Sequence, residues 1–517
     1  MRRVLSSWAV AAFLAASMTV LACGDEDEPP TETSGGSAGK GGAGGKGGSG
    51  GTFGSSGGIA ATGGNGGATE QGGAGGEAEP TGDAGAGPGG AGGTPDDAGP
   101  GGAAGTGGGA AGAPDAAECD LSGEGLEREA LPADIEEDLT LTNDRVWVIE
   151  GTVHVHDGAT LTIPPCTRLE GLSDPTPGFV VALRGGRIVA DGTAEEPILF
   201  TSSQPVGERR AGDWGGVVLL GRAPITRPGG DTEAIYEGLT DEIYTYGGDD
   251  PDNDSGTLRY VRIEFGGWDI FPDKEVNGLS MAGVGRRTVI DHVMVSNTLD
   301  DCFEWWGGTV EASHLIANNC GDDYFDGDEG WRGGARYLFG RRDVASVDSD
   351  DPNGFELDGI NDGTEPRTAF SFQNVTLCGT GEPSPRANPH YGMLLRELVT
   401  GTLENVALLG FEYGIETRDA IAQGDVTIES SSFWALSEGI GETDAGGDDD
   451  GGFDDASIFT ETPSNEVPDP VPFTVAECLE DEGPTAAVLE SGLGAFPDAD
   501  AVARWALDAP WVDWSED

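Results

Sequence analysis

The chain has 517 residues, and 92 acidic side chains against 27 Lys and Arg give it a formal net charge of -65 at pH 7. This balance excludes nucleic acid and anionic lipid surfaces as natural partners, because binding phosphates needs concentrated Lys and Arg. No segment reaches the ~20 consecutive apolar residues of a membrane-spanning helix, which excludes a transporter. The acidic surplus also raises the local concentration of cations.

The N-terminus has the order of a secretory signal. Arg2 and Arg3 precede an apolar stretch over residues 8–18, and the chain then reads Leu-Ala-Cys up to Cys23. This ending resembles the lipobox of bacterial lipoproteins, which implies removal of residues 1–22 and lipidation of Cys23. We therefore expect an exported outer-membrane lipoprotein at the cell surface, held in the membrane by its acyl chains alone. An ordinary signal peptide with an incidental cysteine is the alternative.

Residues 23–117 are dominated by Gly, Ala, Ser, Thr and Pro, with Phe53 and Ile59 as the only large apolar residues between residues 31 and 117. Such a segment cannot bury enough apolar surface to offset its ordering entropy, so we predict a disordered linker. A flexible Gly-rich chain of this length has a root-mean-square reach of roughly 50 Å.

From residue 118 to residue 455, short β-type segments recur at intervals of about 22 to 32 residues, with one double interval. Aligned on one another, they place the following apolar residues in one register: Val261, Val293, Leu315, Val375, Val406 and Phe433. A single unit of this kind cannot bury its apolar side alone, whereas stacked units share a continuous core. The pattern predicts an all-β fold, a single-stranded right-handed parallel β-helix of about 10–12 coils.

A second motif recurs in the same phase, a polar or Gly turn followed by one inward apolar residue. Its inward positions are Leu279, Phe303, Phe325, Phe355, Met393 and Ile415. The alternative folds, a β-sandwich or a propeller, would show hairpin turns every 8–12 residues. We expect residues 456–517 to form a capping segment, in which three tryptophans close the open end of the coil: Trp505, Trp511 and Trp514.

Several stretches also carry a family resemblance. "GATLTIPP", "RIVADGTAEEPILFTS" and "WGGVVLLG" resemble secreted bacterial β-helix proteins of the pectin-lyase-like superfamily. The resemblance covers nearly all of residues 119–517, including the C-terminal "WALDAPWVDWSED". It implies the fold far more than a function, since few of these proteins have an established activity.

Six cysteines remain besides Cys23, and an even set in an exported protein favours disulfides, with 15 possible connectivities. The expected pairs are Cys119–Cys166, Cys302–Cys320 and Cys378–Cys478. The middle pair has the best support, because its spacing is close to one coil.

Acidic residues repeat from one coil to the next. Asp300, Asp301 and Glu304 recur as three further acids, Asp322, Asp323 and Asp326. On a parallel coil, equivalent positions lie about 4.8 Å apart, so these carboxylates should form a ladder on one face. Like charges at that distance either raise pKa values or recruit a cation.

An enzymatic interpretation would use Asp300, Asp301 and Asp323 as acid and base. The "DDCF" turn resembles the Asp-Asp turn of polygalacturonase-type glycosidases, but the Gly-His-Gly and Arg-x-Lys motifs that accompany that turn are missing from the sequence. A lyase would need a basic residue, and no motif singles out one among Arg332, Arg336 and Arg341. A polysaccharide-degrading hydrolase or lyase is therefore the alternative function.

The main prediction is a surface protein that binds extracellular carbohydrate or another cell-surface component. Amphipathic rings beside the acidic ladder would supply the platform: Trp305, Trp306, Tyr324 and Trp331. Asp250, Asp252 and Asp254 have the alternating spacing of a Ca²⁺ loop, so Ca²⁺ is the one cofactor predicted. A structural spacer in the envelope is a third possibility.

Overall fold

The computed structural model describes residues 119–515 except 175, 272–273, 348, 350–351, 387, 420–424, 442–452, 498–502 and 507–510. The predicted signal peptide, the lipidation site Cys23 and the linker lie outside the described residues. The described part belongs to the second of two units, residues 107–517.

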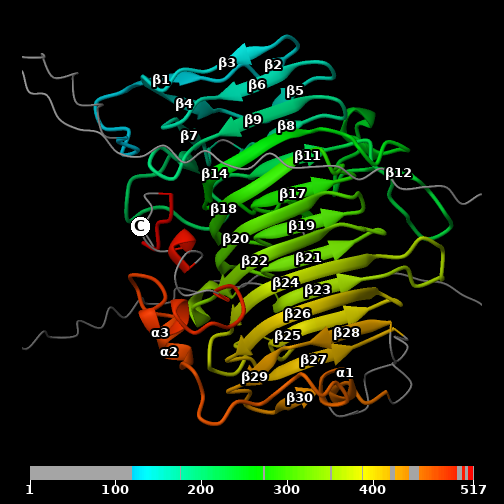
Figure 1. Cartoon of the computed structure of the whole chain (residues 1–517). Helices are drawn as coiled ribbons and strands as arrows, with labels where there is room; N and C mark the ends of the chain where they lie inside the picture. Colours follow the sequence, from blue (N-terminus) through cyan, green and yellow to red (C-terminus); the bar gives the residue numbers. More distant parts are fainter. Residues whose placement is uncertain are drawn as a thin grey trace, which may run out of the picture. The chain divides into compact units, whose positions relative to one another are not determined.

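Two long parallel sheets build this unit, and the chain alternates between them as it coils (Figure 1). The first sheet, called sheet B here, contains eleven strands: β2 (Asp134–Ile135), β5 (Val153–Val155), β8 (Val180–Ala182), β11 (Val217–Leu220), β17 (Leu279–Ala282), β19 (Phe303–Trp306), β21 (Phe325–Asp328), β23 (Asn353–Asp358), β25 (Tyr391–Arg396), β27 (Tyr413–Thr417) and β30 (Gly439–Gly441). Eleven stacked strands agree with the predicted number of coils.

The second sheet, sheet A, contains fifteen strands because several of its coils are split in two. They are β1 (Glu127–Ala130), β3 (Leu139–Thr140), β4 (Arg145–Ile149), β6 (Thr160–Ile163), β7 (Arg168–Gly171), β9 (Arg187–Asp191), β10 (Ile198–Ser202), β14 (Gly256–Glu264), β18 (Val289–Thr298), β20 (Glu311–Cys320), β22 (Gly334–Arg341), β24 (Ala369–Cys378), β26 (Thr400–Leu409), β28 (Val426–Glu429) and β29 (Ser432–Trp434). Together the two sheets confirm the predicted parallel β-helix.

The predicted register of the core holds over most of sheet A. Successive strands pair Val261 with Val293, Val293 with Leu315, and Val375 with Val406. Leu338 of β22 occupies the double interval in the sequence, between Leu315 and Val375. Phe433 departs from the predicted register by two positions, because it pairs with Leu408 and not with Val406. Both positions face the same interior, so the error does not alter the fold.

Sheet B supplies the opposite wall of the core. Leu279 pairs with Phe303, Phe303 with Phe325, and Phe325 with Phe355, and these residues are fully buried. The rings of Phe303 and Phe325 stack with centroids 5.4 Å apart. This continuous apolar column fixes which side chains of each strand face outward.

Most long strands of sheet A bend at a residue with positive φ. These residues place four rings in one outward stack, Tyr260, His292, His314 and Tyr337, with centroids 4.1 to 4.8 Å apart. In the next two coils, the bend is held by an asparagine pair, in which Asn405 Nδ2 donates to Asn374 Oδ1 at 2.8 Å. The stacked rings leave an apolar strip along the side of the coil.

The C-terminal segment covers this strip, so the prediction that its tryptophans close the open end is wrong. Trp511 meets His292 edge to face at 5.4 Å, and Trp514 lies 4.5 Å from the guanidinium of Arg341. The last coil is covered instead by α1 (Ala456–Thr460), where Phe459 stacks on Phe433 at 4.2 Å. The tryptophans go to the side because outward apolar residues of sheet A need cover there.

All three expected disulfides are confirmed: Cys119–Cys166, Cys302–Cys320 and Cys378–Cys478. The last one ties α2 (Val475–Cys478) to the end of β24, and α3 (Ala486–Leu489) follows it. Short 3-10 turns lie at Glu242–Tyr244, Val344–Ser346 and Ala503–Ala506. No helix in the described part of the chain is long and apolar enough to cross a membrane.

Two antiparallel hairpins interrupt the coils between β11 and β17. They are β12 (Glu233–Ile235) with β13 (Thr245–Gly247), and β15 (Asp269–Phe271) with β16 (Lys274–Glu275). Tyr236, just after β12, donates or accepts a hydrogen bond with Ser280 Oγ at 2.9 Å and contacts Trp306 edge to face at 5.2 Å. The first hairpin therefore lies against the outer side of sheet B.

Candidate functional site

An acidic cleft opens on the outer side of sheet B, with a volume of about 180 Å³. Of its nine lining residues, one is Trp306 and eight are carboxylic acids: Glu237, Asp300, Asp301, Glu304, Asp322, Asp323, Asp326 and Glu356. Glu237 comes from the segment after β12, and the others come from three successive coils. No Lys or Arg is among these lining residues.

The alternation of the strands explains this concentration of acid. In β19, Phe303 and Trp305 face the core, so Glu304 and Trp306 face outward. The next coils repeat the pattern, and Glu304 pairs in register with Asp326, which stacks in turn on Glu356. A parallel stack therefore copies one acidic position of the sequence into a row.

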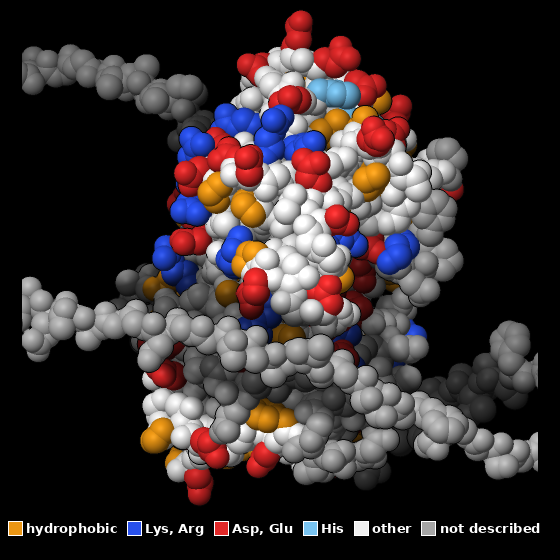
Figure 2. Space-filling view, turned by 90° about the vertical axis from the view of Figure 1, so that its right-hand side faces the viewer, with side chains coloured by type: hydrophobic (Ala, Val, Ile, Leu, Met, Phe, Trp, Pro, Cys, Tyr) orange, Lys and Arg blue, Asp and Glu red, His pale blue; other side chains and the backbone are white. Residues whose placement is uncertain are grey.

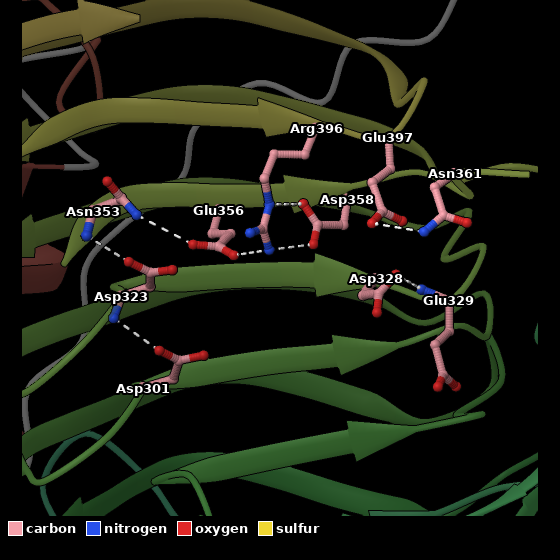
Figure 3. A network of polar contacts seen from close by, with 10 residues as sticks. All are labelled: Asp301, Asp323, Asp328, Glu329, Asn353, Glu356, Asp358, Asn361, Arg396 and Glu397. Carbon is pink, nitrogen blue, oxygen red and sulfur yellow. Dashed lines mark hydrogen bonds and ion pairs between the residues drawn. The ribbon is translucent and has the colours of Figure 1, made fainter. Parts of the chain in front are cut away.

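The turns before these strands contribute a second row, and Figure 3 shows its residues Asp301, Asp323 and Asn353. Asp323 N–H donates to Asp301 Oδ1 at 2.8 Å, and Asn353 N–H donates to Asp323 Oδ1 at 2.5 Å. Each aspartate thus holds the turn of the next coil in place. One oxygen of each carboxylate is bound to backbone, and Asp301 and Asp323 are 5% and 2% exposed.

Arg396 of β25 lies at one end of the first row, which consists of Glu304, Asp326 and Glu356. Its guanidinium donates to Asp358 at 2.8 and 2.5 Å and also pairs with Glu356 (Figure 3). At the other end, the amide of Asn277 donates to Glu304. Arg396 and Asn277 thus bond the two end residues of the row, and its middle stays acidic.

Burial, and then the charges of neighbouring acids, raise the pKa of four cleft carboxyls well above their usual values. The neighbours are Asp300 for Asp301 and Asp322 for Asp323, and the other two raised carboxyls, Glu304 and Asp326, have acidic neighbours as well. Such groups either keep a proton at neutral pH or share a cation. This gives the cleft two chemical capacities, a proton-donating carboxyl and a cation site.

The cleft contains three overlapping sets of three carboxylates. Within each set, one oxygen from each residue lies within 4.8 Å of the other two. They are Asp300, Asp301 and Asp322; Asp301, Glu304 and Asp326; and Asp323, Asp326 and Glu356. Oxygens that share one Ca²⁺ at its usual bond length of about 2.3–2.6 Å lie at most about 5 Å apart. The donor set therefore fits a hard divalent cation, and the first and third sets share no residue.

The family assignment agrees with this architecture. Residues 133–445 match the model of the pectate-lyase-like β-helix domain. The chain belongs to this family. The sequence matches none of the curated proteins.

Among solved structures, this pectate-lyase-like β-helix is similar to the catalytic domain of a GH87 α-1,3-glucanase. One structure, in complex with nigerose, shares 12% identity over 66% of this chain and 68% of that chain, with a TM-score of 0.28. A variant of the same domain with tetrasaccharides shares 10% identity, also with a TM-score of 0.28, over 66% of this chain and 68% of that chain. Likeness at this level carries no information about activity.

The predicted aromatic platform is wrong for three of its four residues. Trp305 and Trp331 are fully buried and stack on each other inside the coil at 4.6 Å, and Tyr324 donates from the interior to Cys378 O at 2.8 Å. Trp306 does line the cleft, although only 6% of it is exposed. On the face seen in Figure 2, hydrophobic side chains form only small, separate patches.

In the predicted calcium loop, the three carboxylates are engaged separately. Asp250 Oδ1 accepts from Asp252 N–H at 3.1 Å, Asp252 pairs with Arg286 at 3.2 Å, and Asp254 pairs with Arg187 at 2.7 Å. Both arginines are distant in sequence, so the spacing of the loop could not reveal them.

The alternative catalytic residues Asp300, Asp301 and Asp323 do come together in the cleft. Sequence reasoning missed Glu237, Glu356 and the counter-ion Arg396. Glu356 had a usable signal, because it follows Phe355 as Glu304 follows Phe303. Glu237 had none, since it reaches the cleft from an inserted hairpin.

Proposed function

We propose that the protein is an exported, lipid-anchored cell-surface β-helix that binds neutral carbohydrate through a divalent cation, Ca²⁺ foremost, in the acidic cleft. The observation that carries the proposal is the overlap of three carboxylate sets within 4.8 Å in one cleft. Since no basic side chain lines the cleft, a cation is the direct counterpart to this charge.

When bound, the cation would offer open coordination positions to sugar hydroxyls, because Ca²⁺ takes six to eight oxygen ligands. The protein's own part is to fix the carboxylates, which the backbone bonds of Asp301 and Asp323 do. Trp306 supplies the apolar edge of the cleft. An anionic glycan would be repelled by the acidic side chains that line the cleft, so a neutral one is favoured.

The test is a glycan array probed with the soluble chain in Ca²⁺ and again in EDTA. We expect binding to neutral glycans in Ca²⁺ that is lost in EDTA and in Asp301→Asn. Asp252→Asn is the matched control, since it removes a carboxylate outside the cleft. Binding that persists in EDTA, or that both variants weaken equally, would overturn the proposal.

Glycoside hydrolysis is the second candidate, favoured by the raised pKa of Asp301 beside Asp300. A carboxyl that keeps its proton next to an ionised one is the arrangement of a general acid with its base or nucleophile. Release of reducing ends from bound glycans, lost in Asp301→Asn and retained in Asp252→Asn, would establish it. Binding without any release would leave cation-dependent recognition alone.

A further inference from the structure

A second groove, with a volume of about 520 Å³, lies on the other sheet, across β18, β20, β22 and β24. Its lining includes Arg286, Asp291, Glu311, Arg332, Arg336 and Gln373, and we call it the arginine groove. Gly333 and Gly334 also line the groove, at positions where neighbouring backbone leaves no room for a side chain. A Cβ at Gly333 would lie 1.9 Å from Val310 O, and one at Gly334 would lie 2.7 Å from Ser371 O.

The outward row of sheet A that crosses the groove is a ladder of paired polar residues. In register it runs Asp191, Arg259, Asp291, Ser313, Arg336 and Gln373. Arg259 pairs with Asp191 at 2.7 Å, Ser313 donates to Asp291 at 2.7 Å, and Gln373 donates to Glu404 at 3.3 Å. Only neutral Ser313 and Gln373 flank Arg336 in this row.

Among the described residues, the side chains of Arg332 and Arg336 have neither an ion pair nor a hydrogen bond. The third arginine of the groove, Arg286, is paired with Asp252 at 3.2 Å. Asp291 is already held by Ser313 and by His314 Nδ1 at 2.9 Å. Two free guanidinium groups in one groove are notable in a chain with a net charge of -65.

We propose that the arginine groove binds an anionic saccharide, with its carboxylate or sulfate groups on Arg332 and Arg336. The guanidinium fork matches planar oxyanions and binds them with charge-assisted hydrogen bonds. Hydroxyls of the saccharide meet Ser313 of β20 and, on the far side of β22, Ser371 and Gln373 of β24. The site needs no cation, which separates it from the acidic cleft and makes it independent of the proposed function.

The test is titration calorimetry of the full chain, in EDTA, with three oligosaccharides of equal length: neutral, carboxylated and sulfated. We expect the charged saccharides to bind, and each of Arg332→Gln and Arg336→Gln to weaken binding about tenfold or more. Arg287→Gln is the matched control. Arg287 is exposed and follows the groove residue Arg286 in sequence, but it does not line the groove itself. Thermal melting of each variant verifies folding.

The two charged saccharides distinguish the source of the anion, and binding of either one supports the proposal. Equal binding of the neutral saccharide would overturn it, as would equal losses in Arg287→Gln and Arg336→Gln. If neither charged saccharide binds, the proposal is also overturned.

Discussion

Asp326→Asn is the sharpest perturbation of the acidic cleft, because Asp326 belongs to two of the three carboxylate sets. The first set and the third set share no residue, so we expect the wild type to bind up to two cations at once. In the variant, only the set of Asp300, Asp301 and Asp322 stays complete. One of the two ions should therefore be lost.

The size of the effect follows from linkage. A cation at 100 times its dissociation constant stabilises the folded state by about 2.7 kcal/mol. A folded unit of roughly 400 residues has an unfolding entropy of about 0.8 kcal/mol/K. Dividing the stabilisation by this entropy gives a rise in Tm of about 3 °C for each ion. We expect Ca²⁺ to raise Tm by about 6 °C in the wild type and by about 3 °C in Asp326→Asn.

The same shift should depend on pH, with a sign set by the raised pKa values of Asp301, Glu304, Asp323 and Asp326. In the absence of a cation, a raised pKa contributes stability that is complete below the ordinary pKa near 4 and is lost as pH rises through the folded value. Protons and Ca²⁺ therefore compete for the cleft. The Tm gain from Ca²⁺ should grow from about pH 5 to about pH 8.

Differential scanning fluorimetry in Ca²⁺ and in EDTA measures both effects, with Asp252→Asn as the control that should keep the full shift. Comparing the two conditions at each pH cancels titrating groups elsewhere in the chain. An unchanged shift in Asp326→Asn, or a gain that shrinks as pH rises, would refute the reasoning.

Three further outcomes are expected. Trp305→Ala should lower the free energy of unfolding by about 3–5 kcal/mol in a denaturant titration, since Trp305 is a core residue; a variant as stable as the wild type would contradict its placement. Replacing Cys378 and Cys478 with Ala should lower the free energy of unfolding by about 4–5 kcal/mol, because the disulfide closes a loop of 100 residues in the unfolded chain. An unchanged Tm would argue against that bond. Cys23→Ser should move the protein from the membrane pellet to the soluble fraction, and retention in the pellet would exclude lipid anchoring at Cys23.

The coil and the acidic row could be read from the sequence because a parallel stack converts a linear repeat into a column. The spacing from Phe303 to Phe325 fixes the register, and that register alone places Glu304 beside Asp326. Part of what the sequence could not show depended on contacts outside the repeat. Trp306 is covered by Tyr236 of a hairpin, and Asp252 is taken by Arg286. The burial of Trp305 followed from strand alternation, once Phe303 was assigned to the core.

The bond between Cys119 and Cys166 also bears on mechanics. A pull arriving along the backbone from the residues before Cys119 enters the described part at Cys119 and passes through the disulfide to Cys166, beyond β6. The strands β1 to β6 lie inside the loop that this bond closes, so tension bypasses them. The first coils therefore do not separate one by one under force. The force acts instead on the pairing of β7 with β10.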